Sequence, residues 1–415
     1  MAKKDDKYSY SLSYLAWQRF RKNKLAMFGL FTIGLLMLVA ILGYLITPDS
    51  TPDANEQLLE ISKKPPGFKT QILLDRKNEQ SHDVNFFYKM LFGEVSDYSS
   101  IPVSSYRFEG ADIVITPYTG SQKAKVPEKK LNLANVAYAL NFNSEITSNV
   151  EEETIDFFEL GSTAPTRKTI EELRALVEKE HIVTRKFILG TDPQGRDLLS
   201  RLIIGIRVSF SVGFIAVFIS VIIGILLGSL AGYYRGKVDN IIVWFINVVW
   251  SVPTLLLVIA ITLVLGKGFW QVFIAVGLTM WVEVARVIRG QIISLREKEF
   301  VEAGRALGFT NLRIILRHIL PNVMGSVIVI SASNFAAAIL IEAGLSFLGI
   351  GAQPPTASWG AMISAHQGFI ISDSPYLAFM PGLAIMLIVL AFVLLGNGLR
   401  DALDRKVTDE DQVMY

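Results

Sequence analysis

The sequence has 415 residues, of which 51% are hydrophobic and 19% are charged, and its formal net charge is +2. Low charge combined with long apolar blocks is typical of a protein that crosses a membrane several times, and so small a net charge does not indicate nucleic acid as a partner. Cysteine is absent, which excludes disulfides and thiolate metal sites, and the four histidines do not lie at metal-ligand spacing, so no bound metal is expected.

Residues 1–47 are predicted to form a basic cytoplasmic segment and the first membrane span. The apolar block from about Leu25 to Ile46 is long enough to cross the bilayer as a helix. It follows four basic residues, Arg19, Arg21, Lys22 and Lys24. A cleaved signal peptide is the alternative, but the apolar core is too long and no small-residue cleavage site follows it. A retained signal anchor is therefore favoured.

Residues 48–186 are mixed in composition and are predicted to form a small α+β domain outside the cytoplasmic membrane. Thr169–Glu172 has the pattern of a capping box, which predicts a helix. The helix would share one apolar face, formed by Ile170, Leu173, Leu176 and Val177. Residues Asp112–Thr116 are predicted to be a strand. The domain would either present a docking surface for another protein or shape the outer face of the membrane domain, or it is a decoration without a role of its own.

Residues 187–404 are predicted to hold five further spans. These are about Val208–Tyr233, Ile241–Leu265, Val272–Ile288, Val323–Leu345 and Leu377–Leu395. With the first span this makes an all-α polytopic membrane protein of about six transmembrane helices.

The distribution of Lys and Arg predicts the orientation. These residues are concentrated in the loops after the second, fourth and sixth spans, on the same side as the basic N-terminus, whereas the loop 346–376 has none and Lys267 stands alone in its loop. Both termini, including the tail 405–415, are therefore expected in the cytoplasm. Arg201 and Arg207 go against this trend, and we expect an interfacial stretch whose long side chains reach the headgroups.

The polar segment 297–321 lies between apolar blocks, where a membrane protein keeps it in water and accessible to a soluble partner. Glu302 and Arg305 can pair at i, i+3, Gly308 suits a left-handed helix C-cap, and Thr310 can begin a second short helix. Pro321 would end that helix or start the fifth span. Two short surface helices with a bend at Gly308 are predicted.

Small residues at positions 303, 304 and 306 would let another protein approach this segment closely. The alternative interpretation is an ordinary amphipathic helix on the membrane surface. The residue pattern by itself does not choose between the two.

Several residues in or next to the membrane spans are candidates for structural or functional roles. Asp192 is expected to form a turn and Asp197 to cap the helix of the second span, with a metal or catalytic carboxylate pair as the less favoured reading. Glu283 is expected to pair with Arg286, and Glu342 has no partner close in sequence. Asn247 and Asn334 are expected to hydrogen-bond between helices, and the glycines at 277, 325, 344 and 349 are expected to permit packing.

No catalytic or nucleotide-binding motif is visible. The stretch from Ala231 to Val238 contains Gly236-Lys237 but fails the phosphate-loop pattern at both ends, and neither a nucleophile elbow nor a zinc-protease helix occurs. The chain is therefore expected to be non-catalytic and to bind no cofactor, so that the nucleotide chemistry of any uphill transport belongs to another polypeptide.

The surface segment resembles the Glu-Ala-Ala signature of ABC-importer permease subunits. The matching residues are Glu302, Ala303, Gly308, Leu320 and Pro321. Gly304 replaces the second alanine, and His318 stands where isoleucine is usual. Neither change breaks the helix, although both could tune the choice of partner.

Other stretches resemble more narrowly the C-type permease subunit of the dipeptide, oligopeptide and nickel importers. They are Trp17–Lys24, Leu189–Arg201, Tyr233–Gly236, Arg286–Gly290, Glu342–Gly351 and Pro354–Gly360. The resemblance covers residues 11–47 and 187–404, and the insertion lies outside it.

This resemblance implies the type I importer permease fold in the inner membrane of a bacterium and a role in ATP-driven uptake, with peptides as the favoured cargo. It implies a homologous second permease subunit, two cytoplasmic ATPase subunits and an extracytoplasmic substrate-binding protein as partners. It also implies that the ATPase is coupled through Glu302, Ala303, Gly304, Gly308, Leu320 and Pro321. The alternatives are an ion-coupled secondary transporter, which would need buried carboxylates and broken helices, and a membrane-anchored extracytoplasmic sensor or enzyme.

Overall fold

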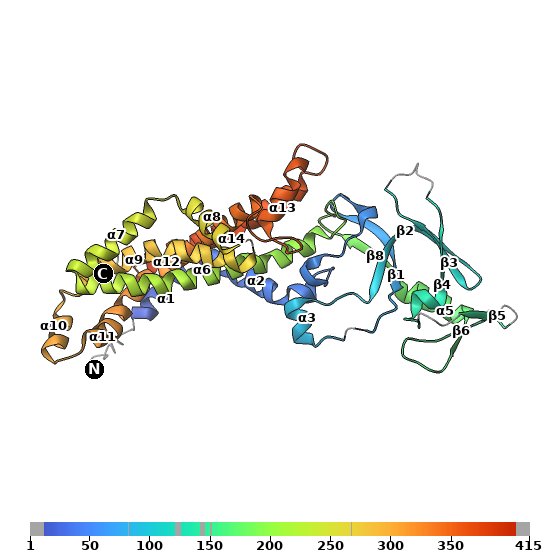
Figure 1. Ribbon diagram of the computed structural model, residues 1–415, viewed down its shortest axis with the longest axis horizontal. Coiled ribbons are helices and arrows are strands. Elements are labelled where there is room, and N and C mark those ends of the chain that lie inside the picture. The colour runs from blue at the N-terminus through green and yellow to red at the C-terminus, as the bar shows by residue number, and fades with distance from the viewer. Residues whose placement is uncertain are drawn as a thin grey trace, which may run out of the picture. The chain divides into compact units, whose positions relative to one another are not determined.

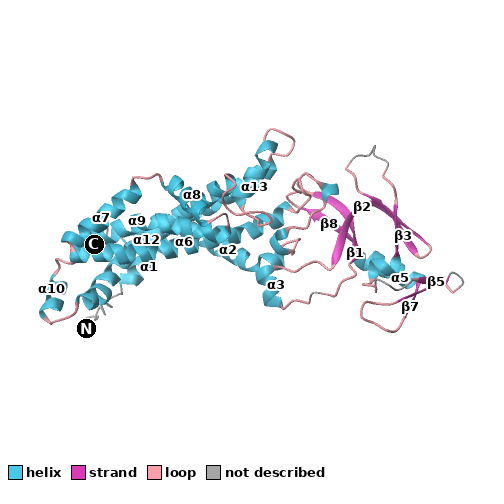
Figure 2. Cartoon of the chain, viewed as in Figure 1, coloured by secondary structure: helices cyan, strands magenta, loops and turns pink. Residues whose placement is uncertain are grey.

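The computed structural model describes residues 12–403 except 82, 121–125, 142–145, 150–151 and 267. The predictions made for residues 1–11, for Lys267 and for the tail 405–415 therefore lie outside the described residues. The chain forms two compact units, and all described strands belong to one of them (Figure 2). The membrane unit comprises Met1–Leu38, Gly205–Gln367 and Ala378–Tyr415, and the sheet-bearing unit comprises Val39–Ile204 and Gly368–Leu377.

Five helical stretches in the described chain are long and apolar enough to cross a membrane (Figure 1). They are α2 (Lys24–Ile46), α6 (Leu198–Tyr234), α9 (Phe269–Leu295), Asn311–Phe347, which ends in α12 (Leu320–Phe347), and α14 (Tyr376–Leu403). The shorter helices beside them are α1 (Leu12–Lys22), α10 (Glu299–Ala306), α11 (Asn311–Arg313) and α13 (Trp359–His366). Packing of α13 against α12 gives the loop after α12 a fixed structure.

The predicted third span is broken into α7 (Gly236–Trp250) and α8 (Thr254–Leu265), which meet at an angle of 90°. Pro253 lies in the break. Because proline has no N–H and disfavours helical geometry in the residue before it, the helix stops before Pro253 and restarts after it. Counting this bent pair as one span gives six, which confirms the predicted number but not a straight third helix.

A stripe of glycines brings α6 close to α9. A Cβ atom added to Gly224 would lie 2.5 Å from a Val284 carbon. One added to Gly228 would lie 2.6 Å from the Ala285 carbonyl oxygen, and one added to Gly232 would lie 2.9 Å from the Arg289 carbonyl oxygen. Small residues at every fourth position are the usual way for two membrane helices to pack backbone to backbone.

Packing roles were expected for four other glycines, at positions 277, 325, 344 and 349. The structure confirms this expectation most clearly for Gly277. A Cβ at Gly277 would lie 2.7 Å from a carbon of Ile219, so this residue also packs α9 on α6. Gly325 makes only an ordinary contact, 3.7 Å from Leu403. Cβ atoms at Gly344 and Gly349 would meet nothing within 4 Å, so tight packing does not require glycine at those two positions.

The sheet-bearing unit has the α+β structure that was predicted for the insertion. Its five-stranded antiparallel sheet has the order β4-β3-β2-β1-β8, and a second sheet has the order β5-β6-β7. The strands are β1 (Phe68–Arg76), β2 (Tyr98–Glu109), β3 (Asp112–Pro117), β4 (Lys129–Asn132), β5 (Thr147–Asn149), β6 (Thr154–Phe157), β7 (Thr166–Thr169) and β8 (Ile182–Phe187). The predicted strand at Asp112–Thr116 is β3.

Three short helices accompany the sheets, namely α3 (Phe86–Phe92), α4 (Leu133–Ala137) and α5 (Ile170–Leu176). The core of the unit includes Leu73, Val103, Ile113, Ile115, Leu133, Ile155, Phe157, Leu173 and Val177. The predicted capping box is present, because the Thr169 hydroxyl accepts the Glu172 N–H at 3.1 Å and the Glu172 carboxylate accepts the Thr169 N–H at 3.2 Å.

We expect Gly228→Ala to weaken the packing of α6 on α9, because its methyl group would meet the Ala285 carbonyl at 2.6 Å. The cost should be about 1–3 kcal/mol, as for overpacking elsewhere. Gly290→Ala is the matched control on α9, since its Cβ would meet nothing within 4 Å. Unfolding of the purified full chain by SDS, followed by tryptophan fluorescence, measures the difference. Equal stability of the two variants would contradict the close approach.

Candidate functional site

The polar segment 297–321 forms a helix, a reversal and the first turns of a membrane helix. After α10 the chain turns at Leu307–Thr310 and resumes as α11, which continues through the π-helical turn η4 (Ile314–Ile319) into α12. Two separate surface helices were predicted, so the second is wrong: it is continuous with the fifth span. Pro321 lies at the start of α12, directly after the π-helical turn η4.

The reversal has the capping geometry that was predicted. Gly308 has a φ of 77°, which lies in the left-handed region. Most residues other than glycine and asparagine avoid this region. The Gly308 N–H donates to the Arg305 carbonyl at 2.9 Å, and the Phe309 N–H donates to the Gly304 carbonyl at 3.0 Å. On the far side, the Thr310 hydroxyl accepts the Arg313 N–H at 3.4 Å. The bend is therefore held by backbone hydrogen bonds at the end of α10 and by a side-chain cap at the start of α11.

One side of α10 is buried against the ends of the membrane helices. Val301 belongs to a core cluster with Tyr233 of α6, Ile288 and Ile292 of α9, and Ile314 of the helix that leads into α12. Because protein interiors are close-packed, a displacement of α10 is transmitted to the ends of all three helices.

Gly304 also faces inward. A Cβ there would lie 3.5 Å from the Phe309 ring and 3.8 Å from Ile314. The expectation that Gly304 lets another protein approach is therefore corrected, because its neighbours belong to its own segment. Glu302, Ala303, Gly308 and Pro321 are exposed, and Leu320 is half-buried.

The outer side of the segment carries large apolar side chains that the sequence analysis missed. Leu307 is 71% exposed and Leu312 is 65% exposed, and Phe300 and Leu316 are exposed as well. They could have been found from helical spacing, because they lie opposite the buried Val301, Ile314 and Ile315. Uncovered apolar residues at a helix reversal mark a contact surface.

Aromatic rings hold the basic residues of the segment. The Tyr233 hydroxyl donates to the side-chain amide oxygen of Asn311 at 2.8 Å. The Arg305 guanidinium lies 5.5 Å from the centroid of the Tyr233 ring. The expected pair of Arg305 with Glu302 does not form, because Arg305 is directed toward this ring. His318 stacks on Phe309 with 5.5 Å between ring centroids, a contact that isoleucine would not provide in the same form.

The two membrane carboxylates differ from expectation. Glu342 is buried, and its Oε1 accepts the Ser346 hydroxyl at 2.6 Å and the Ser358 hydroxyl at 2.8 Å. Its second partner is distant in sequence and lies just before α13. Glu283 is exposed on α9 instead of pairing with Arg286, whose guanidinium lies 3.5 Å from the Trp250 ring centroid.

Glu283 borders a cavity of about 160 Å³ in the membrane unit. Its lining includes Trp250, Thr254, Leu257, Thr279, Met280 and Ile341. A carboxylate within a membrane span faces water or protein instead of lipid. The expected interhelical bonds of Asn247 and Asn334 are not found either: Asn247 is exposed, and the buried Asn334 amide nitrogen has no hydrogen-bond partner among the described residues.

The loop that precedes α6 uses its two aspartates for local structure. The Asp192 carboxylate accepts the Gln194 and Arg196 N–H groups, both at 2.9 Å, and binds the Arg196 guanidinium at 2.6 Å. Asp197 caps α6, because its Oδ2 accepts the Ser200 N–H at 2.8 Å and the Ser200 hydroxyl at 2.5 Å. Turn and cap are the roles predicted for these two residues.

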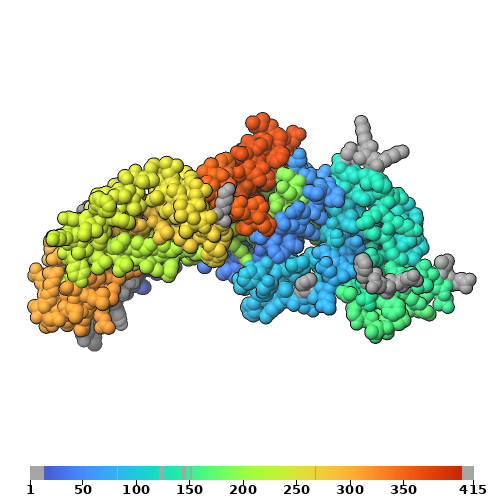
Figure 3. Space-filling view, viewed as in Figure 1, coloured from blue at the N-terminus to red at the C-terminus, as the bar shows by residue number. Residues whose placement is uncertain are grey.

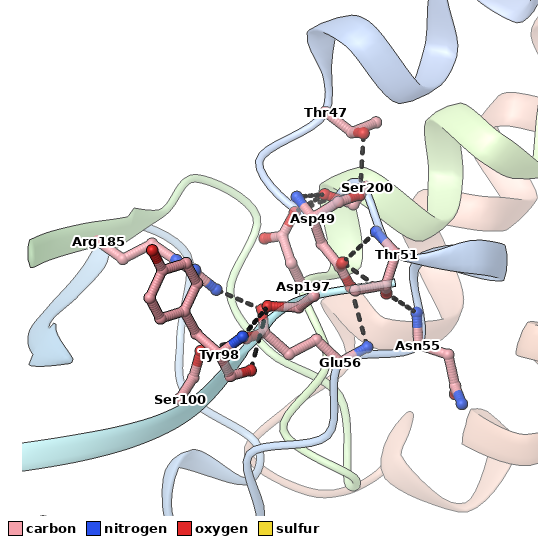
Figure 4. Close-up of polar contacts among 11 residues, drawn as sticks. Thr47, Asp49, Thr51, Asn55, Glu56, Tyr98, Ser100, Arg185, Asp197 and Ser200 are labelled. Carbon is pink, nitrogen blue, oxygen red and sulfur yellow. Dashed lines mark hydrogen bonds and ion pairs between the residues drawn. The ribbon is translucent and has the colours of Figure 1, made fainter. Parts of the chain in front are cut away.

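A buried polar network connects this cap to the end of α2 (Figure 4). The Asp49 N–H donates to the Ser200 hydroxyl at 3.1 Å, and the Asp49 carboxylate accepts the Thr51 hydroxyl at 2.7 Å and the Glu56 N–H at 3.0 Å. The Glu56 carboxylate in turn binds the Arg185 guanidinium of β8 at 2.5 Å. The sheet is thus connected to the ends of two membrane helices.

Arg201 belongs to the same region. It is buried in the first turn of α6, and its guanidinium donates to the Asp53 carbonyl at 3.2 Å. The prediction of an interfacial stretch with Arg201 at the headgroups is wrong, because the residues after α2 fold over this side chain and supply its acceptors.

Burial raises the pKa of both Asp49 and Asp197 above the ordinary 3.8, although their hydrogen bonds oppose the shift. The negative charge of Asp49 raises the pKa of Asp197 further. Both carboxylates are therefore easier to protonate in the folded protein than in the unfolded chain.

Two protein families match parts of the sequence. Residues 224–409 match the family described as the binding-protein-dependent transport system inner membrane component, and residues 11–66 match the N-terminal TM domain of oligopeptide transport permease C. The glutathione transport system permease proteins GsiD of Escherichia coli O6:K15:H31 and of Shigella boydii serotype 4 are each 45% identical to this chain over 218 residues, which are 52% of this chain and 72% of theirs.

Among solved structures, a chain of the MetNI methionine ABC transporter in an inward-facing conformation is 16% identical, with a TM-score of 0.43 over 50% of this chain and 98% of that chain. A chain of an amino acid ABC transporter with histidines is 20% identical, with a TM-score of 0.35 over 49% of this chain and 92% of that chain.

We expect the stability of the folded chain to depend on pH through Asp197. Because its pKa is raised in the folded state, the folded state gains stability at low pH, and this gain is lost as pH rises from about 4 through the raised value. Asp197→Asn keeps a capping oxygen and removes the charge, so its stability relative to the original chain should rise over that window. Thermal unfolding of the full chain in detergent at several pH values measures this difference.

Asp156→Asn is the control with the opposite sign. The Arg167 guanidinium, 2.7 Å away, lowers the pKa of the exposed Asp156, so this pair loses its small contribution as pH falls. Parallel pH profiles for Asp197→Asn and the original chain would show that the buried carboxylate is not ionised in the way that the structure indicates.

Proposed function

The chain belongs to the family of binding-protein-dependent transport system inner membrane components, and on this basis we propose that it forms half of the pore of an ATP-driven peptide importer. It is the membrane subunit of an importer and a multi-pass protein of the inner membrane. Relatives named for the transport of glutathione, which is a small peptide, support peptides or related small solutes as the cargo.

The observation that carries the coupling role is the two-sided surface of α10. Its outer side and the following reversal expose Leu307 and Leu312, while its inner side buries Val301 among residues of α6, α9 and α12. A protein that binds the exposed leucines can therefore move the ends of three helices through a packed core. Glu302, Ala303 and Gly308 lie on the accessible part of the segment, with Pro321 at the start of α12.

The energy source in this proposal is a pair of cytoplasmic ATPase subunits. Nucleotide binding closes the ATPases, each closure displaces a docked segment, and the membrane helices move between inward-open and outward-open states. The driving force is the different affinity of nucleotide for the two conformations. This chain contributes no phosphate-binding loop to the reaction, so ATP is bound and hydrolysed on the partner subunits.

The remaining partners follow from the same proposal. A homologous second permease would form the other half of the pore, and a substrate-binding protein would deliver the cargo on the extracytoplasmic side. Both termini would then be cytoplasmic, as the distribution of Lys and Arg predicts. The sheet-bearing unit would lie outside the membrane, where it is available to dock the binding protein or to shape the pore entrance.

Reconstitution into proteoliposomes tests the function as a whole. Vesicles that hold this chain together with its second permease, ATPases and binding protein should accumulate a labelled peptide only when ATP reaches the ATPase subunits. Vesicles that hold this chain alone should accumulate none. Uptake by the chain alone in response to a proton gradient would support the ion-coupled secondary transporter instead and would overturn the proposal.

We expect Gly308→Val to separate ATP hydrolysis from transport. Its backbone has φ 77°, and a β-branched residue there is strained by about 1–2 kcal/mol, which favours a different geometry of the reversal. A Cβ at this position meets nothing within 4 Å, so the chain should still fold and insert. Transport per ATP hydrolysed, measured in the proteoliposomes, should fall.

Gly308→Asn is the matched control, because asparagine tolerates left-handed geometry. It should keep most of the coupling although it also adds a side chain. If Gly308→Val transports as well as Gly308→Asn, the reversal does not carry the coupling.

A further inference from the structure

Helix α3 exposes a cluster of aromatic and aliphatic side chains. Five of its seven residues are large apolar residues that are between 50% and 65% exposed, namely Phe86, Phe87, Tyr88, Leu91 and Phe92. Figure 3 shows the light-blue segment that contains α3 at the surface of the molecule. Soluble surfaces rarely present so contiguous an apolar patch unless it binds something.

Helical spacing concentrates the patch on one side. Phe87, Tyr88, Leu91 and Phe92 are separated by one, three, four or five positions, which places them within one arc of the helix. Lys89 lies outside that arc and forms an ion pair with Glu94. The Asn85 side chain caps the helix start by accepting the Phe87 N–H at 3.3 Å. The result is a short helix with an aromatic side, whose other side carries Phe86 and Lys89, the one charged residue of the helix.

The end of α3 is fastened to the end of α2. The Glu94 N–H donates to the Ser50 carbonyl at 2.9 Å. A Cβ at Gly93 would lie 2.7 Å from the same carbonyl oxygen and 3.1 Å from the Tyr44 ring, so only glycine fits this approach. Figure 1 shows α3 beside the end of α2, and all of these residues belong to the sheet-bearing unit.

The length of α2 places that contact at a membrane surface. Its 23 residues span about 35 Å at 1.5 Å per residue, against a hydrocarbon core of about 30 Å. The basic residues before Leu25 mark one membrane surface, so the other lies near Ile46, and Tyr44 is two residues from it. Because Gly93 touches Tyr44, the end of α3 lies at the depth of the lipid headgroups.

We propose that α3 is an interfacial membrane anchor, with the rings of Phe87, Tyr88 and Phe92 inserted among the headgroups and upper acyl chains of the bilayer surface where α2 ends. Aromatic residues favour this zone because their rings are apolar and polarisable, and a Tyr hydroxyl keeps contact with water. Amphipathic helices lie in the plane of the interface. Lys89, outside the aromatic side, remains in water beside Glu94.

Lipid is the occupant that the position of α3 favours. The last turns of α2 expose Ile41 and Ile46, as expected of a lipid-facing helix, and Tyr44 of the same turns contacts Gly93. A protein partner would have to reach a patch that already lies at membrane depth. The anchor and the Asp49 network would together restrain the sheet-bearing unit on the end of its own membrane helix. This inference does not depend on the cargo or on the energy source.

Because the chain contains no cysteine, single-cysteine variants can test the depth of α3 directly. Phe87→Cys in the full chain is labelled with a nitroxide in lipid nanodiscs, and collisions of the label with oxygen and with a water-soluble nickel chelate are compared. The label should collide with oxygen and be shielded from the nickel chelate. Phe92→Cys provides a second site, where the same result is expected.

Ala175→Cys is the matched control, since it is exposed on α5, another short helix of the same unit that Figure 1 shows away from the end of α2. Its label should collide freely with the nickel chelate. Equal nickel accessibility at positions 87, 92 and 175 would overturn the proposal. Shielding of position 87 that develops only after partner proteins are added would overturn it as well, because the patch would then bind protein.

Discussion

The close approach of α6 to α9 is the contact on which the membrane unit depends. Gly224, Gly228 and Gly232 lie where a single added carbon would meet the backbone or a side chain of α9. In a bilayer there is little hydrophobic gain from pairing two apolar helices, so close van der Waals packing and hydrogen bonds must hold them together. The end of α9 then leads into α10, so the position of the coupling segment follows from this pair.

The buried side of α10 explains how a small displacement could have a large effect. Val301 shares one core cluster with α6, α9 and the start of α12, and such a core changes between discrete arrangements because it has little free volume. Moving a two-state equilibrium from 1:99 to 99:1 requires about 5.5 kcal/mol of differential binding. In the proposed mechanism that free energy enters through the exposed surface of α10 and its reversal.

The sheet-bearing unit contains two kinds of contact near the end of α2, one polar and one apolar. Buried hydrogen bonds join Asp49, Ser200 and Asp197, although Oδ1 of Asp197 has no hydrogen-bond partner among the described residues. The aromatic side of α3 is exposed and instead gains by leaving water. The first set orients the sheet on the helix ends, and the second, in our proposal, holds it against lipid. Together they give the insertion a mechanical connection to α2 and α6 as well as a covalent one.

Features that depend only on neighbouring residues could be predicted from the amino-acid sequence. Span lengths follow from hydropathy, the Thr169–Glu172 capping box from spacing, and the Gly308 reversal from the conformational freedom of glycine. The α+β character of the insertion was also predictable, because strand and helix patterns are local. In the candidate site, the bend and the exposure of Glu302 and Ala303 could be read in the same way.

The partner that each side chain contacts depends on the tertiary structure and could not be predicted from the sequence. Gly304 faces inward, and Arg286 contacts Trp250 instead of Glu283. Glu342 accepts a hydroxyl group sixteen positions away, and the segment after α2 covers Arg201. The rings of α3 are exposed near Tyr44. These outcomes depend on contacts between segments far apart in the chain, and periodicity within one segment contains no information about which distant surface will pack against it.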